Sequence, residues 1–485
     1  MSNAPAVLRI FGLIALIFCT TMLVPLAASW WLHEGTEPVF QDSLLVTLAA
    51  GALLWLAARR HTEELKVRDG FLLVVLVWVG LPAFATLPLL LYFPDMSFTD
   101  AYFETVSGLT ATGATVIEGL DKLPFSINLW RAELVWLGGM GLIVLAVAIL
   151  PLLGVGGRQI FKAEAPGPMK ETKLTPRMAE TAKGLWLVYG AISAACFAGY
   201  SWAGMSWKDA LIHTFTTMGL GGFSSHDASF GYWNSPRIEA VAILFMTLAG
   251  LNFATHFLVW RRRSVKPYAL DPEAKWFLLV MFASVLGIAL YLWQKGTYPD
   301  LGDALRFSAF NVVSIATTTG YASTDYNQWP IFAPLWMLFL SSFATCSGST
   351  GGGIKMVRAI LLYKQVFREL IRAMHPAAVT PLKLGGDTVP NAISFAVLAF
   401  GFMYMVCIVS LTLVMSASGL DIVTAFSAVV ASINNTGPGL NQVGPATTFA
   451  SLTDFQTWVY TVAMLVGRLE IFTLLVVLTP AFWRK

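Results

Sequence analysis

Four short tracts rich in glycine and threonine stand out in this 485-residue chain, because their atoms could bind a cation through oxygen alone. Glycine permits backbone angles that turn successive carbonyls toward one side. Neighbouring threonines add hydroxyl oxygens, and a ring of such oxygens can replace the hydration shell of a potassium-like ion. The tracts are Thr110-Ala111-Thr112-Gly113, Leu220-Gly221-Gly222-Phe223, Thr317-Thr318-Thr319-Gly320 and Asn435-Thr436-Gly437-Pro438.

The tracts belong to an internal repeat, since the residues before them also align. Asp100 and Asp209 each lie thirteen positions before their glycine and are each followed by alanine. Val106, Val313 and Val430 each lie seven positions before theirs. A glycine that only kinks or ends a helix is the alternative interpretation of any single tract. Four tracts in register favour one shared site built from four equivalent loops.

Each tract follows a half-apolar stretch that is too short to cross a membrane, and Phe98 to Leu109 and Trp207 to Met218 predict short helices. An acid near the first turn complements the positive end of such a helix. The helix stops at the tract, so its negative carboxyl end would attract a cation. Backbone outside helices is tolerated at membrane depth only where it is buried in protein or lines a wet cavity. The four loops therefore predict a common pore.

Long apolar segments must hold these loops. The chain is 56% hydrophobic and 12% charged, with a mean hydropathy of +0.67, which excludes a pair of soluble domains. The first segment is too long, and too closely followed by a second, to be a cleaved signal peptide. We predict about ten membrane spans. They lie near residues 8–32, 40–58, 71–93, 130–153, 184–204, 237–260, 275–294, 332–363, 390–417 and 455–480.

The placement of charge predicts the orientation of these spans. Basic residues cluster in alternate loops, at 59–68, 158–183, 261–266, 355–372 and 484–485, so these loops and both termini are expected in the cytoplasm. The intervening loops are richer in acid and are expected outside. A net charge of +3 is too small to indicate nucleic-acid binding. The four cysteines lie in or beside apolar segments and indicate neither a disulfide framework nor a metal site.

The tracts SGLTATGATV, MGLGGFSSHD, TTTGYASTDY and NNTGPG resemble the filter loops of the Trk/Ktr/HKT superfamily of potassium transporters. The resemblance covers nearly the whole chain. It implies an all-α membrane protein of the bacterial inner membrane, with four pseudo-symmetric repeats of helix, re-entrant pore loop and helix around one pore, plus an extra N-terminal helix pair. It also implies a homodimer surrounded by membrane lipid, K⁺ as the bound and transported ion without a covalently bound cofactor, and control by a cytosolic nucleotide-binding subunit of TrkA type.

On this plan the expected boundaries are 1–69 for the N-terminal pair, 70–153 for repeat 1, 154–262 for a cytoplasmic linker and repeat 2, 263–372 for repeat 3 with a gating loop, and 373–485 for repeat 4. The second tract departs from the Thr-Gly pattern because Gly221 precedes its central glycine. The residues expected to bind K⁺ are Thr112, Gly113, Gly221, Gly222, Thr319, Gly320, Thr436 and Gly437. The residues expected to flank them are Thr110, Ala111, Leu220, Thr318 and Asn435.

A second polar tract, Ser341 to Gly353, falls inside a predicted span, where it cannot be a plain lipid-facing helix. Its GSTGGGIK segment lacks the spacing of a nucleotide-binding P-loop. In the family the matching segment is an intramembrane loop under the filter. By that resemblance we expect a gate formed by Gly348, Gly351, Gly352, Gly353 and Arg468.

Arg468 lies in the last apolar span, where a buried guanidinium is costly and a functional role is the default expectation. The alternative is an ion pair, with Glu470 or with another helix, that only holds the bundle together. The matching family residue projects toward the pore below the filter, where its charge would hinder cation flow.

Two other groups of polar residues have weaker signals. Asn252 and His256, four positions apart, are expected to pack and to form hydrogen bonds. His226 and Asp227 follow the second tract and are expected at the outer mouth. The basic stretches 154–183 and 355–383 are either ordinary cytoplasmic charge or docking surfaces for the regulatory subunit.

Three classes of function remain to be weighed. A channel-like uptake protein accounts for the four loops and for the scarcity of ionisable residues in the spans. A proton- or sodium-coupled symporter would need a carboxylate or histidine relay at mid-membrane, and only Glu470 and His256 offer one. An enzyme would need paired carboxylates or a nucleophile with its base, and we find neither at a useful spacing.

Overall fold

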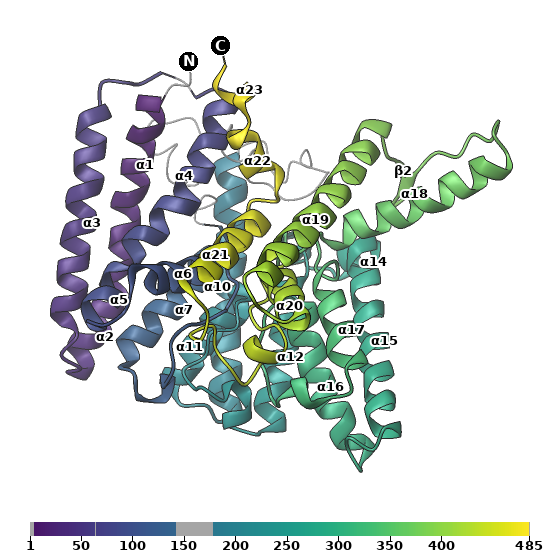
Figure 1. The fold of residues 1–485 in the computed structure, drawn as a ribbon, viewed down its shortest axis with the longest axis horizontal. Helices are drawn as coiled ribbons and strands as arrows, with labels where there is room; N and C mark the ends of the chain where they lie inside the picture. The colour runs from purple at the N-terminus through teal and green to yellow at the C-terminus, as the bar shows by residue number, and fades with distance from the viewer. Residues whose placement is uncertain (1–3, 64, 142–177, 485) are drawn as a thin grey trace.

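The computed structural model describes residues 4–63, 65–141 and 178–484. Helices dominate the described chain, and both of its ends lie on the same side (Figure 1). The N-terminal helix pair packs closely at Gly12, where an added Cβ would lie 2.8 Å from the backbone nitrogen of Trp55. Small residues at such contacts are the usual way to pack helices in lipid. The pair consists of α1 (Ala4–Cys19), a 3-10 turn (Thr20–Met22), α2 (Leu23–Leu32) and α3 (Glu37–Ala58).

The rest of the chain repeats one unit four times: a first helix, a short pore helix, a loop and a second helix. Repeats 1 and 2 contain α4 (Val67–Ala85), α5 (Leu87–Tyr92), the pore helix α6 (Phe98–Leu109) and α7 (Phe125–Gly139), then α10 (Met178–Ala203), the pore helix α11 (Trp207–Gly219), α12 (Pro236–Gly250) and α13 (Phe253–Arg262). Repeats 3 and 4 contain α14 (Lys266–Leu270), α15 (Pro272–Gln294), the pore helix α16 (Leu301–Ala316), α17 (Phe332–Ser341) and α18 (Met356–Met374), then α19 (Asn391–Ala417), the pore helix α20 (Ile422–Ile433), α21 (Asp454–Arg468), α22 (Phe472–Leu478) and α23 (Pro480–Trp483). A two-stranded hairpin, β1 (Lys383–Leu384) and β2 (Asp387–Thr388), joins α18 to α19.

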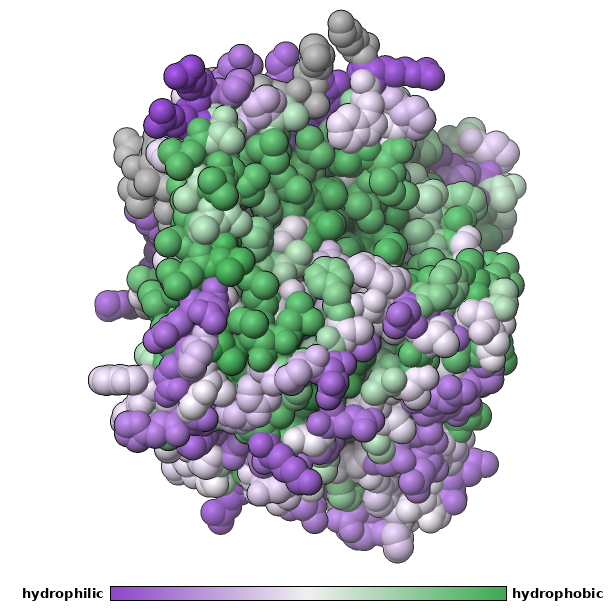
Figure 2. Space-filling view, turned by 60° about the vertical axis from the view of Figure 1, so that its left-hand side comes forward, coloured by the Kyte–Doolittle hydropathy of each residue, from purple (hydrophilic) through white to green (hydrophobic). Residues whose placement is uncertain are grey.

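Apolar surface surrounds this bundle as expected of a membrane protein. Six of the described helices are long and apolar enough to cross a membrane, and two bent pairs could each supply one more span. Figure 2 shows a broad hydrophobic band on one face, with hydrophilic residues gathered on either side of it. The prediction of an all-α membrane protein is confirmed.

Three predicted spans are wrong as single helices. The span at 237–260 bends by 95° between α12 and α13, and the span at 455–480 bends by 112° between α21 and α22. The span at 332–363 ends at Ser341, and a polar tract separates it from α18. Hydropathy does not reveal the two bends, because the residues on either side of each are as apolar as those of a continuous span, whereas the polar tract Ser341 to Gly353 marks the third break in the sequence. Of the span at 130–153, the part beyond residue 141 lies outside the described residues, as does most of the basic stretch at 154–183.

Each pore helix begins at a side-chain cap on the acidic side of the repeat. Ser97 and Ser206 accept hydrogen bonds from the backbone nitrogens of Asp100 and Asp209, at 3.1 Å in both cases. The predicted acids are thus third residues of their helices, and the serines are the caps. In repeats 3 and 4 the caps are Asp300 and Asp421. All four helices thus begin with a side-chain cap and end at a glycine tract, so the negative carboxyl end of each helix lies at its tract.

Candidate ion-conduction site

The four glycine tracts meet, and their central glycines form a closed ring of backbone contacts. Each glycine faces the backbone of the next loop, from loop 1 to 2, 2 to 3, 3 to 4 and 4 back to 1. In every case a Cβ added to the glycine would lie less than 3.0 Å from that backbone, a separation that real Cβ atoms essentially never show. Only glycine allows the loops to come this close. The contacts are Gly113 on Gly222, Gly222 on Thr319, Gly320 on Thr436, and Gly437 on Thr112.

The backbone conformation of the four loops is also nearly fourfold symmetric. The residue two positions before each glycine has a left-handed φ, between 54° and 62°. The central glycine is left-handed in loops 1, 3 and 4, where φ is 82°, 88° and 95°. Gly222 is not among the positive-φ residues, so loop 2, which departs from the Thr-Gly pattern in sequence, also departs in conformation. The flanking residues with left-handed φ are Ala111, Leu220, Thr318 and Asn435.

The threonine hydroxyls before the glycines have different partners. The hydroxyl of Thr112 pairs with that of Thr110 at 2.7 Å and accepts a hydrogen bond from Asn435 at 3.0 Å. The hydroxyl of Thr319 pairs with that of Thr317 at 2.7 Å. The buried hydroxyl of Thr436 has no hydrogen-bond partner among the described residues. An orphaned oxygen of this kind fits a cation ligand, whereas the other two hydroxyls are largely satisfied by protein.

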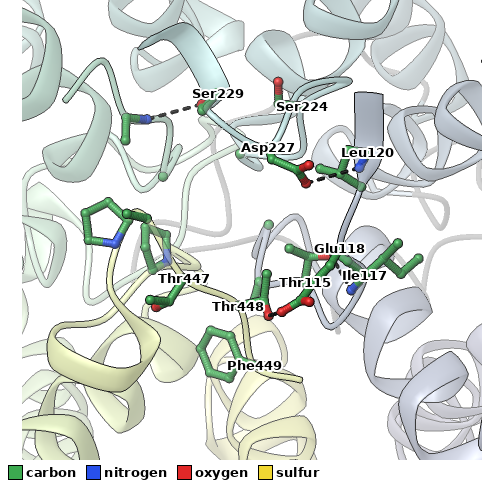
Figure 3. Close-up of a pocket in the computed structure, with 18 of the residues that line it drawn as sticks. Thr115, Ile117, Glu118, Leu120, Ser224, Asp227, Ser229, Thr447, Thr448 and Phe449 are labelled. Atoms are coloured by element: carbon green, nitrogen blue, oxygen red, sulfur yellow. Dashed lines mark hydrogen bonds between the residues drawn. The ribbon is translucent and has the colours of Figure 1, made fainter. Parts of the chain in front are cut away.

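A cavity of about 630 Å³ opens outward from the ring. Its rim comes from the segments that follow the central glycines, and Figure 3 shows Glu118 and Asp227 at its edge. Thr448 donates a hydrogen bond to Glu118 at 2.9 Å, and Asp227 accepts one from the backbone nitrogen of Leu120 at 3.1 Å. Both acids are exposed, so they lend the mouth a negative potential that favours cations.

His226 links repeats 1 and 2 at this outer mouth. Its ring stacks on Tyr232 with a centroid distance of 3.6 Å, and its nitrogens contact the carboxylates of Asp121 and Asp209. Partial burial would lower the pKa of His226, but the contacts with the carboxylates of Asp209 and Asp121 outweigh this effect and raise that pKa above the usual 6.5. The bonded form is therefore the imidazolium, and His226 fastens the two loops by an ion-pair cluster.

This cluster predicts a pH-dependent contribution to stability. Because the pKa of His226 is raised in the folded state, its stabilising effect is fully present below the unfolded pKa and is lost as the pH rises through the folded value. We expect His226→Gln to lower the midpoint of thermal unfolding more at pH 6 than at pH 9. The exposed His61 in another loop serves as control, and His61→Gln should show no such difference. Equal losses for His226→Gln at both pH values would contradict the ion-pair cluster.

The polar tract after α17 contacts the carboxyl end of α11 and the residues that follow α16 and α20. Gly352 donates its backbone N–H to the hydroxyl of Thr318 at 2.8 Å, and a Cβ added to Gly352 would overlap the carbonyl oxygen of Asn434. Thr350 donates its hydroxyl to the carbonyl of Met218 at 2.9 Å. The predicted gate residues Gly351 and Gly352 thus pack against the residues that follow the pore helices of repeats 3 and 4.

Gly348 and Gly353 lie farther from the ring. Phe253 donates its backbone N–H to the carbonyl of Gly348 at 3.0 Å, where the chain breaks between α12 and α13. A Cβ added to Gly353 would lie 2.6 Å from the carbonyl oxygen of Ser341. These contacts anchor the middle of the tract to the break between α12 and α13, and its last residue to the end of α17.

Arg468 ties the polar tract to α7 of repeat 1. Its guanidinium donates to the carbonyls of Thr350 at 3.1 Å and of Gly139 at 3.2 Å, and also to that of Gly138. The guanidinium carbon also lies 5.5 Å from the ring centroid of Trp78. Arg468 therefore contacts both the polar tract and the end of α7.

Glu470 does not pair with Arg468 as one interpretation of the sequence allowed. Its carboxylate binds Arg358 of α18 at 2.6 Å. Helix α21 ends at Arg468, and Glu470 follows in a tight turn with a φ of 52°, which aims its side chain elsewhere. Lys355, buried beside these groups, donates to the carbonyl of Gly351. Lys355 and Arg358 belong to the basic cluster at 355–372, which the charge pattern predicts to be cytoplasmic, so the sequence does not mark their burial at this site.

Asn252 and His256 make the hydrogen bonds expected of them. Asn252 caps α13 by accepting from the backbone nitrogen of Ala254 at 2.8 Å. One ring nitrogen of His256 is 2.9 Å from the carbonyl of Leu248, and the other is 2.5 Å from the hydroxyl of Tyr268. Their contacts lie at the bend between α12 and α13, away from the ring.

Known proteins match the chain over nearly its full length. Residues 36–485 match the family model TrkH, described as a cation transport protein. The chain is 46% identical over 483 residues to the Trk system potassium uptake protein TrkH of Vibrio parahaemolyticus, and 45% identical over 481 residues to that of Halomonas elongata, with 99% of each chain covered. The crystal structure of the potassium transporter TrkH from Vibrio parahaemolyticus superposes with a TM-score of 0.89 at 44% identity, covering 99% of both chains. The chain belongs to the TrkH family of cation transport proteins.

Proposed function

We propose that this chain is a potassium-preferring uptake protein whose single pore passes through the ring of four glycine tracts. The observation that carries the proposal is the closed ring of contacts around Gly113, Gly222, Gly320 and Gly437. It brings backbone carbonyls from four loops to one axis, and the carboxyl ends of four capped pore helices point at it. Both features favour a dehydrated cation. The relatives named potassium uptake proteins support K⁺ as the ion.

In the proposed mechanism a cation enters the acidic outer cavity and loses its water to the carbonyls of the ring. The hydroxyl of Thr436 is the side-chain oxygen best placed to assist, since it has no hydrogen-bond partner among the described residues. Below the ring the tract at 347–353 and Arg468 form the gate. Movement of the tract away from Thr318 and Asn434 would open the way to the cytoplasm.

The family resemblance extends the proposal to the surroundings of the pore. We place the protein in a bacterial inner membrane with both termini cytoplasmic, as a homodimer under the control of a nucleotide-binding subunit of TrkA type. The amphipathic helix α18 projects from the bundle on the side of the chain ends (Figure 1), and its basic residues offer that subunit a docking surface. Channel-like flux is favoured over symport because Glu470 is paired with Arg358, and both ring nitrogens of His256 are occupied by hydrogen bonds.

The proposal is tested by cation flux into liposomes that hold the purified chain. Uptake of K⁺, Rb⁺, Na⁺ and Li⁺ should follow the imposed gradient of each ion, with K⁺ and Rb⁺ ahead of the smaller ions. If flux required a proton or sodium gradient, the protein would be a symporter and not a channel. No flux of any of the four ions, with or without such a gradient, would overturn the proposal.

The hydrogen bonds of Thr350 provide a test of the gate. Thr350→Val keeps the shape of the side chain but removes the bond to Met218, so it should loosen the tract and raise flux measured without any partner. One net hydrogen bond of about 1 kcal/mol corresponds to roughly a fivefold increase. Thr247→Val, which loses a bond to Ile243 within α12, is the matched control and should leave flux unchanged. Flux unchanged in a folded Thr350→Val protein would count against the tract as a gate.

A further inference from the structure

The residue nine positions before the filter glycine is buried and polar in three of the four pore helices. The residues are Glu104, His213 and Asn311, before glycines 113, 222 and 320, and they are 1%, 0% and 0% exposed. Repeat 4 has alanine at this position, and the neighbouring Ser427 is the buried polar residue there. None of these side chains belongs to the glycine ring, and burying polar groups is costly unless they are hydrogen-bonded.

Each of these side chains holds the segment that leaves the filter on its outer side. The carboxylate of Glu104 accepts from the backbone nitrogen of Val116 and from the hydroxyl of Thr115, both at 3.0 Å. These residues follow Gly113 by three and two positions. Glu104 thus holds the backbone of Val116 and the side chain of Thr115 in the segment that leaves loop 1.

The same connection recurs in the other three repeats with different chemistry. In repeat 2, a ring nitrogen of His213 lies 2.9 Å from the hydroxyl of Ser224. In repeat 3, Asn311 donates to the hydroxyl of Ser323 at 3.0 Å and accepts from its backbone nitrogen at 3.2 Å. In repeat 4, Ser427 accepts from the backbone nitrogen of Leu440 at 2.8 Å. Four unlike residues perform one task at one depth, which a purely local packing role does not require.

Arg131 of α7 joins the connections of loops 1 and 2. Its guanidinium, 1% exposed, binds Glu104 at 2.8 Å and the hydroxyl of Thr115 at 3.1 Å. It also donates to the carbonyl of Ser224 at 3.4 Å, and its carbon lies 4.3 Å from the ring centroid of Phe223. Phe223 directly follows Gly222. The side chain of Arg131 therefore contacts the segments that leave both loop 1 and loop 2. Arg131 also lines the outer cavity.

We propose that Glu104 with Arg131, His213, Asn311 and Ser427 are positioning residues that set the width of the outer half of the filter and thereby its preference for K⁺ over Na⁺. They hold the chain on the outer side of each glycine, while the left-handed residues hold it on the inner side, so the carbonyls between them are fixed at both ends. When a connection is lost, the loop can move, and its carbonyls can then bind ions smaller than K⁺. The inference rests on the proposed function, because it takes the glycine ring as the filter.

The test compares K⁺ and Na⁺ flux in liposomes for two independent disruptions. The double variant Glu104→Gln with Arg131→Met removes both charges at similar volume, so that no unpaired charge stays buried. Asn311→Leu removes the connection of repeat 3 with apolar atoms only. We expect each to lower the ratio of K⁺ to Na⁺ flux by about fivefold, the fold-change that corresponds to one net hydrogen bond. Ser323→Ala, which keeps the backbone bond to Asn311, should give a smaller decrease.

The matched control is an ion pair whose side chains are 23% and 3% exposed and whose contacts lie elsewhere. Arg306 of α16 binds Glu239 of α12 at 2.6 Å and also Asn234, so Glu239→Gln with Arg306→Met should leave the ratio as in the wild-type protein. An unchanged ratio in all the disrupted variants, together with a lowered ratio in Gly113→Ser, would overturn the positioning role and leave the filter assignment intact. An unchanged ratio in Gly113→Ser as well would overturn the filter assignment itself.

Discussion

Gly113→Ser is expected to abolish most of the preference for K⁺ over Na⁺ while the protein stays folded. Gly113 has a φ of 82°, which costs a residue with a side chain roughly 1–2 kcal/mol. The added Cβ would also press on the backbone of Gly222, so loops 1 and 2 must separate. A shift of about 1.4 kcal/mol in the relative barriers of the two ions would change their flux ratio about tenfold.

The control for this variant is Gly35→Ser in the N-terminal helix pair. Gly35 has a similar φ of 75°, but an added Cβ would have no neighbour within 4 Å. It therefore reproduces the backbone strain without touching the ring. The two proteins are compared by K⁺ and Na⁺ flux at equal density in liposomes. The filter assignment of Gly113 would be wrong if its variant kept the wild-type ratio, or if Gly35→Ser lowered the ratio equally.

Arg468→Ala is expected to raise cation flux in the absence of any partner. Arg468 places a positive charge beside Thr350 and Gly139, in the proposed path of the cation. A screened repulsion of about 1 kcal/mol already changes flux roughly fivefold. The substitution also removes the bonds from Arg468 to Thr350 and Gly139, which releases the tract from repeat 1.

Two further variants separate the charge from the hydrogen bonds. Arg468→Lys keeps the charge but cannot reproduce the forked donor, and Arg468→Gln keeps a donor without charge. If charge sets the barrier, the flux of the lysine variant should stay near that of the wild-type protein, and the flux of the glutamine variant should approach that of the alanine variant. Should the alanine variant conduct no faster than the lysine variant, the electrostatic barrier would be abandoned, and Arg468 would be a residue that only holds the tract in place.

The pore loops could be predicted from sequence because their signals are local. A short helix, an acid in its first turn and a glycine tract at its end lie within about one helix length of each other, and α6 has the predicted bounds Phe98–Leu109. The fourfold register then required that the loops meet. The boundaries of the repeats remain a proposal, since they depend on where the connecting segments are divided.

The breaks at Leu251 and Ile471 could not be predicted, because nothing local marks them, whereas the polar tract Ser341 to Gly353 marks the break after α17. Leu251 and Ile471 are as apolar as their helical neighbours, and the bends there depend on bonds to distant residues, such as that from Phe253 to Gly348. The pair of Glu104 and Arg131 is marked in the sequence. Both are charged residues in apolar stretches predicted to lie in the membrane, and an ionisable residue in such a place indicates a functional role. Their shared role appears only when the loops are seen together.

The most direct test of the central claim is to locate the ion itself. Crystals grown with Rb⁺ in place of K⁺ give an anomalous signal at each bound ion. The account predicts a peak on the axis enclosed by the carbonyls of the four glycine tracts, and weaker occupancy there in Gly113→Ser. A rubidium peak bound elsewhere in the protein, with none inside the ring, would contradict it.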